Sequence, residues 1–168
     1  MPIKLSKKTN LVDFIDNVKD AKAHLHNILL WPAAWKKFAA PHKLKWHECN
    51  FSFSAKSSIP NQPGVYAFFI EPRFYRALPV AVLMYVGKTD RSLRMRFGEY
   101  LKEAADPTGR PAVSFILTAY SGHLTFYCAP VKPPRIPAKI EDELLASFMP
   151  PLNKTYPASV RRTVAAFK

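Results

Sequence analysis

The apolar positions in the first part of the chain recur at the spacing of a helix. Large apolar side chains lie three and four positions apart from residue 11 to residue 30. Residues at this spacing share one face of a helix, so the pattern predicts a long amphipathic helix over 11–30 with Asn10 as its N-cap. Pro32 cannot continue that helix, and we predict a second, shorter helix over 33–39.

The middle of the chain carries strand and turn signals. Apolar and aromatic runs over 65–70, 80–86 and 124–131 predict strands, the first two joined as an antiparallel hairpin with a long loop. The uncharged run over 113–119 is interpreted as a further strand, because the turn signal Ser121-Gly122 separates it from 124–131.

Two more helices complete the pattern. One is predicted over 92–104, with Asp90 or Ser92 as its cap, and the other over 138–148. The sequence therefore predicts an α+β fold, in which a small central antiparallel sheet of about three strands is flanked by helices. A helical extension precedes it at the N-terminus.

The domain organisation follows from these elements. Residues 1–59 form a mostly helical extension packed on the core, within which Phe51 and Phe53 alternate with polar neighbours and indicate a short strand. Residues 60–156 form the core domain. Residues 157–168 are interpreted as a basic C-terminal tail.

The charge of the chain points to an anionic partner. Its 168 residues include 25 Lys and Arg against 12 Asp and Glu, a formal net charge of +13. A compact domain this basic favours nucleic acid as a partner, although a merely basic surface is the alternative. All the arginines lie after residue 60, where we expect specific phosphate contacts, because the planar guanidinium fits phosphate oxygens.

The cysteines and the hydropathy pattern bear on localisation. Cys49 and Cys128 are too few for a disulfide scaffold and fit a reducing compartment. No segment has the pattern of a secretory signal or a membrane span. We therefore expect a cytoplasmic protein.

Glu141 occupies an unusual position on the helix predicted over 138–148. The apolar stripe of that helix is formed by Ile140, Leu144, Leu145 and Phe148. Glu141 falls inside this stripe, whereas Asp142 and Glu143 lie on the opposite face. A carboxylate on the buried side costs several kcal/mol unless a metal or a cationic side chain compensates it. A glutamate at the rim of the stripe that reaches water is the alternative.

The helix predicted over 92–104 offers cationic candidates. Arg96 and Tyr100 are four residues apart and share one edge of its apolar stripe. Arg91 and Arg94 point elsewhere, toward solvent or phosphate. A surface arginine whose stem packs on the helix is the alternative for Arg96.

Several of these residues form an ordered series. Its elements are Pro63-Gly64-Val65-Tyr66, Tyr85-Val86-Gly87-Lys88, Leu93, Arg96, Tyr100, Glu141 and Asn153. The series resembles the GIY-YIG nuclease superfamily over about residues 60–156. Gly64-Val65-Tyr66 stands for the first triplet and Tyr85-Val86-Gly87 for the second. Arg96 takes the place of the helix arginine, with Arg94 as the fallback.

The resemblance implies hydrolysis of phosphodiesters with one divalent metal, most simply Mg²⁺ and alternatively Mn²⁺. The implied catalytic residues are Tyr66, Tyr85, Arg96, Tyr100 and Glu141, with Glu141 as the metal ligand. The implied substrate-binding residues are Lys88, Arg91, Arg94 and Asn153, although Asn153 is expected to tie the helix end to the hairpin rather than to react. Tyr66 is slightly favoured over Tyr85 as general base, its pKa lowered by nearby positive charge.

The resemblance also bears on partners. It implies a nuclease that acts on nucleic acid, most simply double-stranded DNA. A non-catalytic, basic nucleic-acid-binding module on the same fold and an RNA-cleaving enzyme are the alternatives. A homodimer is possible, because cutting both strands of a duplex requires two active sites or two visits.

Overall fold

The computed structural model describes residues 11–38, 44–72, 80–106, 109–133 and 135–167. Within them lie α1 (Leu11–Ala23), α2 (Pro32–Phe38), β1 (His47–Asn50), the 3-10 helix η1 (Phe53–Ser58), β2 (Gly64–Ile70), β3 (Val82–Thr89), α3 (Leu93–Ala105), α4 (Pro111–Ala119), β4 (Leu124–Pro130), α5 (Pro137–Phe148) and α6 (Ala158–Ala165). The predicted cap Asn10 and most of the hairpin loop lie outside the described residues.

The strands form one antiparallel sheet in the order β1-β4-β2-β3. The α+β class and the β2–β3 hairpin are confirmed. The sheet has four strands where about three were predicted, because β1 adds to the outer edge of β4. Strand β3 forms the opposite edge, and this position leaves one side of it open to neighbouring segments.

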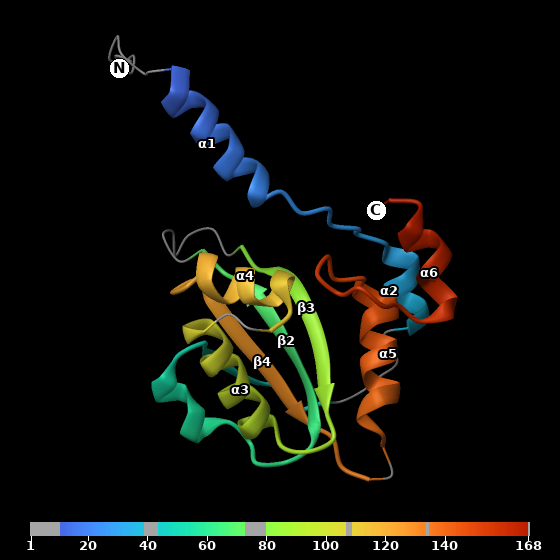
Figure 1. Cartoon of the computed structure of the whole chain (residues 1–168). Helices are drawn as coiled ribbons and strands as arrows, with labels where there is room; N and C mark the ends of the chain where they lie inside the picture. Colours follow the sequence, from blue (N-terminus) through green and yellow to red (C-terminus); the bar gives the residue numbers. More distant parts are fainter. Residues whose placement is uncertain (1–10, 39–43, 73–79, 107–108, 134, 168) are drawn as a thin grey trace.

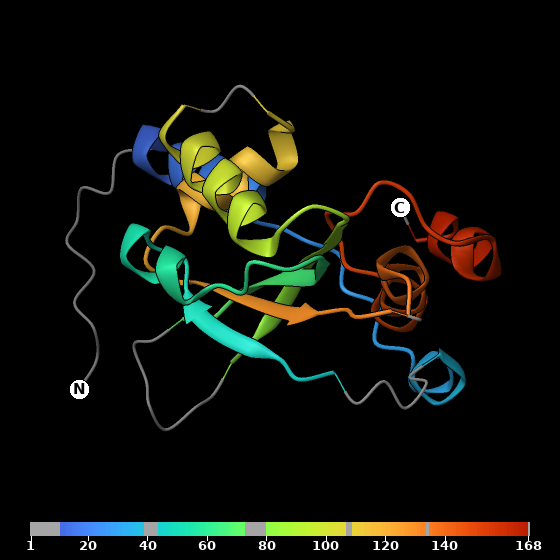
Figure 2. The same cartoon turned by 90° about the horizontal axis from the view of Figure 1, so that it is seen from below.

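Alternate residues of β2 serve two different cores. Tyr66 and Phe68 are buried against α3 and α4, whereas Ala67 packs on the other side among residues of α5. Figures 1 and 2 show α3 and α4 on one side of the sheet and α2, α5 and α6 grouped on the other. The helices therefore enclose both faces of the sheet and leave the β3 edge between them.

A side-chain amide closes part of that edge. The Val86 backbone N–H donates to Oδ1 of Asn153 at 3.0 Å, and Nδ2 of Asn153 donates to the Val86 carbonyl at 2.8 Å. The Leu152 N–H donates to the Met84 carbonyl at 3.1 Å. Asn153 thus ties the segment after α5 to the hairpin, as expected from the sequence.

The strand predicted over 113–119 is wrong, because this segment is helix α4. Pro111 stands in its first turn, where the missing N–H costs nothing. Val113, Ile116 and Leu117 are buried at helical spacing on one face. A short uncharged run carries no period that separates a buried strand from a buried helix, which is why the prediction failed.

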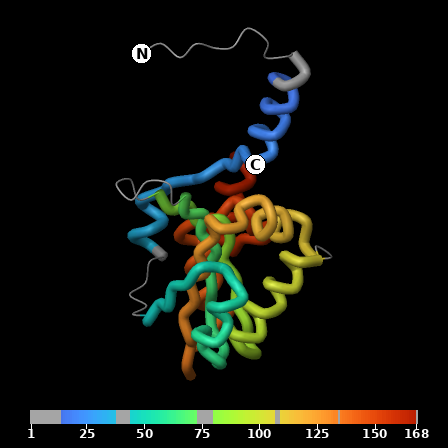
Figure 3. Tube along the Cα trace, turned by 90° about the vertical axis from the view of Figure 1, so that its left-hand side faces the viewer, coloured from blue at the N-terminus to red at the C-terminus, as the bar shows by residue number. Residues whose placement is uncertain are grey.

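The helix predicted over 11–30 is too long, because α1 ends at Ala23. The ring of His24 lies 5.4 Å from that of Phe115, and its Nδ1 is hydrogen-bonded to the Tyr120 hydroxyl. The chain then continues without regular structure to α2. Through this link Leu29 reaches the apolar cluster that contains Leu145 and Ala146 of α5. Figure 3 shows α1 standing away from the body of the protein.

The ends of the core domain differ from the prediction in two ways. Strand β1 lies before Phe51 rather than across it, and Phe53 begins η1. Residues 157–168, interpreted as a tail, contain helix α6, whose Val160 and Val164 are buried. Across the described ranges, no helix is long and apolar enough to cross a membrane.

Candidate active site

A cavity of about 690 Å³ opens beside β3, at the edge of the sheet. It is lined by Tyr85 of β3, by Arg110 just before α4, by Glu141 of α5 and by the segment from Leu152 to Arg161. The edge position of β3 explains this combination, because an edge strand is reached by elements from both faces of the sheet. The cavity is large enough for a nucleotide-sized ligand.

Tyr66 lies beneath this cavity rather than in it. Its side chain is 1% exposed, and its ring lies across Gly87 on the neighbouring strand. A Cβ atom at Gly87 would stand 2.5 Å from the Tyr66 hydroxyl oxygen. The glycine of the second triplet is thus required here because the tyrosine of the first triplet occupies the space of its side chain.

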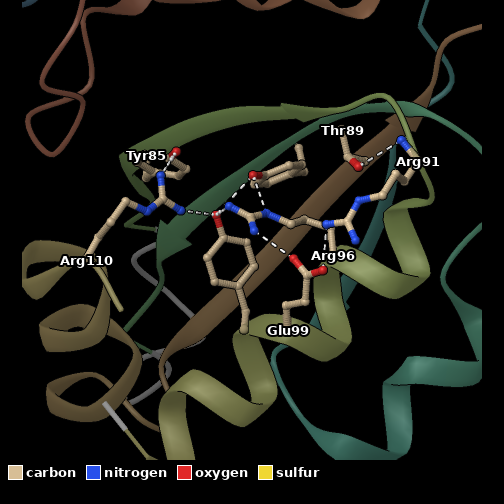
Figure 4. A network of polar contacts seen from close by, with 8 residues as sticks. Tyr85, Thr89, Arg91, Arg96, Glu99 and Arg110 are labelled. Carbon is tan, nitrogen blue, oxygen red and sulfur yellow. Dashed lines mark hydrogen bonds and ion pairs between the residues drawn. The ribbon is translucent and has the colours of Figure 1, made fainter. Parts of the chain in front are cut away.

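Arg96 is committed to contacts within the protein. Its Nε donates to the Tyr66 hydroxyl at 3.1 Å, its Nη2 to the Tyr100 hydroxyl at 3.3 Å and its Nη1 to Glu99 at 2.7 Å. Arg91 donates to the same carboxylate at 2.6 Å. Figure 4 shows Arg96 directed toward Glu99.

Arg110 contacts two of the tyrosines that the sequence analysis grouped with Arg96. Its Nη1 donates to the Tyr85 hydroxyl at 2.6 Å, and its Nη2 donates to the Tyr100 hydroxyl at 2.7 Å. The Tyr100 oxygen also lies 3.0 Å from that of Tyr66. Figure 4 shows Arg110 reaching toward Tyr85 from the start of α4. No carboxylate within the described residues forms an ion pair with Arg110, although the carboxylate of Glu141 in the same cavity is close enough to interact with its charge.

Sequence reasoning missed Arg110 because it assigned the following segment to a strand. Residue 110 precedes a proline, and Pro at the first position of a helix is a start signal. That signal would have placed Arg110 at the N-cap of a helix that follows α3.

Glu141 lines the cavity with Tyr85 and Arg110. Burial raises the pKa of its carboxyl group, and the nearby charge of Lys88 opposes this effect. Within the described part of the chain, no hydrogen bond or ion pair joins the Glu141 carboxylate to another group. A half-buried carboxylate without a partner fits a cation as its counterpart.

The donor set of the cavity fits one hard divalent cation. Magnesium keeps several water molecules and takes only one or two protein carboxylates, and Glu141 offers one. Among the described residues, no group of three or more His, Cys, Asp and Glu could hold a metal by itself. The arrangement therefore suits a hydrated metal and does not suit a closed, protein-only zinc site.

The predicted substrate-binding residues occupy varied places. Lys88 is paired with Asp90, and Arg91 with Glu99. Nε of Arg94 donates to the Ile59 carbonyl at 2.8 Å, so Arg94 contacts the segment before β2. Asn153 borders the cavity, and its side-chain amide forms hydrogen bonds with the Val86 backbone in β3.

The expected lowering of the Tyr66 pKa is not found. Burial raises the pKa of Tyr66 and outweighs the opposing effect of Arg96, and burial also raises the pKa of Tyr100. The positive charge is close, as predicted, but the desolvation of a phenolate at this depth is the larger effect. Of the predicted tyrosines, Tyr85 is the one that borders the cavity.

Comparison with known proteins identifies no relative: no family model, no curated protein and no solved structure matches the chain. The resemblance to GIY-YIG nucleases therefore stays a prediction from the sequence. The geometry adds one cavity that brings together the carboxylate of Glu141, the guanidinium of Arg110 and the phenol of Tyr85 from three distant parts of the chain.

Proposed function

We propose that this protein is a metal-dependent endonuclease that hydrolyses phosphodiester bonds in DNA by single-metal chemistry of the GIY-YIG type. The observation that carries the proposal is the shared cavity of Glu141, Tyr85 and Arg110. Phosphodiester hydrolysis needs a site for a cation, a donor to the phosphate oxygens and a group that handles the proton of the attacking water. These three side chains can supply them.

In this proposal, Glu141 holds Mg²⁺ or Mn²⁺ through a carboxylate oxygen. When bound there, the metal supplies Lewis-acid stabilisation of negative charge on the phosphate and lowers the pKa of coordinated water. Arg110 binds the oxygens of the scissile phosphate with its N–H groups, because no acid of the described residues forms an ion pair with it. Tyr85 lies beside it and orients the attacking water or takes its proton.

The remaining motif residues act as positioning residues. The Tyr100 hydroxyl accepts hydrogen bonds from both Arg96 and Arg110, and it contacts the Tyr66 hydroxyl. This chain of contacts fixes the Arg110 head group against the sheet before any substrate arrives. Fixed donors need no reorganisation in the transition state, which is the advantage of building them into the core.

The test is nicking of supercoiled plasmid with and without Mg²⁺. Glu141→Gln removes the carboxylate charge with little change of shape. We expect a loss of activity of about 100-fold or more, the size of effect seen when a group that stabilises the transition state is removed. Asp142→Asn is the matched control, because Asp142 lines the same cavity but is exposed. Its activity should stay within a few-fold of the wild type.

Two outcomes would contradict the proposal. Equal activity of Glu141→Gln and the wild type would remove the metal assignment. DNA binding without cleavage in Mg²⁺ or Mn²⁺ would favour a non-catalytic module. A matched RNA substrate separates the remaining alternative, because preferential cleavage of RNA would reassign the substrate.

A further inference from the structure

The wall of the cavity includes residues that lie outside the motif series. Lys154 follows the segment that ties α5 to β3, and Arg161 lies on α6. Both line the same cavity as Arg110 and Glu141. The resemblance to nucleases ends at about residue 156, so nothing in it assigns a role to α6.

The charges of these two residues are uncompensated. Across the described ranges, no hydrogen bond or ion pair joins Lys154 or Arg161 to a carboxylate. By contrast, Arg91 and Arg96 share Glu99. Glu141 and Asp142 line the same cavity, but its three cations, Arg110, Lys154 and Arg161, leave an excess of positive charge that an entering anion relieves.

Arg161 is also held in a defined place. Its Nε donates to the Tyr156 carbonyl at 3.3 Å, which leaves the outer N–H groups of the guanidinium to reach the cavity. The neighbouring Val160 is 1% exposed and belongs to the apolar cluster that includes Leu145 of α5. A side chain on a packed helix keeps its position better than one on a free loop.

We infer that Lys154 and Arg161 form a second phosphate subsite, which binds a neighbouring phosphate of the strand whose scissile phosphate lies at Arg110. This inference rests on the proposed function. It makes the substrate a polynucleotide strand rather than an isolated phosphodiester, because the cavity then engages two phosphates at once. The guanidinium of Arg161 contributes directed hydrogen bonds, and Lys154 contributes a point charge.

The test measures equilibrium binding in EDTA, where no cleavage occurs. The probe is a fluorescein-labelled DNA duplex of about 20 base pairs, titrated by anisotropy over a range of NaCl concentrations. The variant Lys154→Gln/Arg161→Gln removes the subsite. Lys102→Gln/Arg162→Gln is the matched control, because Lys102 and Arg162 are exposed like Lys154 and Arg161 but lie outside the cavity.

We expect the subsite variant to bind the duplex about tenfold more weakly, with a salt slope reduced by about 0.9, since the subsite neutralises one phosphate. The control should lose less affinity and keep most of the slope. Arg161→Lys, which keeps the charge, should retain most of the binding, and thermal unfolding of each variant reports any loss of the fold. Equal losses in the two double variants, or no loss in either, would overturn the subsite.

A second readout separates this inference from the proposed function. Bis(4-nitrophenyl) phosphate contains one phosphodiester and cannot use a second phosphate site. The subsite variant should cleave it in Mg²⁺ with the kcat/KM of the wild type while its plasmid nicking falls, and an equal fall on both substrates would contradict the subsite. If the wild type cleaved neither substrate, the proposed function would fail while the binding measurement still decided the subsite.

Discussion

The replacement Arg110→Gln tests which arginine serves the reaction. Arg110 donates to the Tyr85 and Tyr100 hydroxyls at 2.6 and 2.7 Å. At about 0.5–1.5 kcal/mol for each net hydrogen bond, their loss should lower the free energy of unfolding by about 1–3 kcal/mol. The loss of a donor to the phosphate should lower kcat by about 10²–10³-fold, equivalent to about 2.7–4 kcal/mol in the transition state.

Arg94→Gln provides the matched comparison. Arg94 donates one hydrogen bond, to the Ile59 carbonyl at 2.8 Å and away from the cavity, so its removal should cost about 0.5–1.5 kcal/mol, within the same range of stability. Urea denaturation should therefore show two variants of comparable stability, and plasmid nicking should show that only Arg110→Gln loses kcat. Activity of Arg110→Gln within a few-fold of the wild type, or an equal loss in Arg94→Gln, would refute the reasoning.

Three further predictions concern the supports of the site. Gly87→Ala places a Cβ 2.5 Å from the Tyr66 hydroxyl, so overpacking should lower the free energy of unfolding in urea by about 1–3 kcal/mol. Asn153→Ala leaves a backbone N–H and C=O of β3 without their amide partner, and the same measurement should show a loss of about 2–4 kcal/mol. Glu99→Gln should flatten the fall of stability at acid pH. The hydrogen bond from Arg96 lowers the pKa of Glu99 from its ordinary 4.5, so this stability is present above pH 4.5 and is lost as the pH falls through the lowered pKa.

Controls for these variants are available in the same chain. Gly98→Ala lies within α3, where the new Cβ meets only the flexible end of Lys56 at 3.0 Å, so it should be neutral or slightly stabilising. Asn27→Ala removes one exposed hydrogen bond to the Phe167 carbonyl and should cost less than about 1 kcal/mol. Losses in these controls as large as those of Gly87→Ala and Asn153→Ala would contradict the packing argument. For Glu99→Gln, an acid limb as steep as that of the wild type would remove the ion-pair assignment.

The sequence predicted the elements that carry their own start and stop signals. Strand β2 lies between a turn signal and a long loop, and α3 carries its own cap, since the Met95 N–H donates to Ser92 Oγ. Asn153 was also placed correctly, but its place came from the resemblance to the GIY-YIG motif. The predictions of β2 and α3 depended on local chemistry that tertiary contacts reinforce.

The predictions failed where contacts between residues distant in the sequence determine the local structure. The segment over 113–119 is buried on one face and carries no charge, so its helical period was hidden until the neighbouring α3 and sheet were known. Because Arg110 directly precedes this segment, its position at the start of a helix was not predicted either. The direction of the Tyr66 pKa depends on burial to 1% exposure, a property that follows from the crossing of β2, β3 and α3 rather than from nearby residues in the sequence.

Binding of Mn²⁺ followed by electron paramagnetic resonance tests most directly whether Glu141 holds the metal of this site. The account predicts one bound Mn²⁺ per chain in the wild type, its loss in Glu141→Gln and its retention in Asp142→Asn, because Glu141 is the half-buried, unpaired carboxylate of the cavity. Unchanged Mn²⁺ binding in Glu141→Gln, or equal losses in both variants, would contradict it.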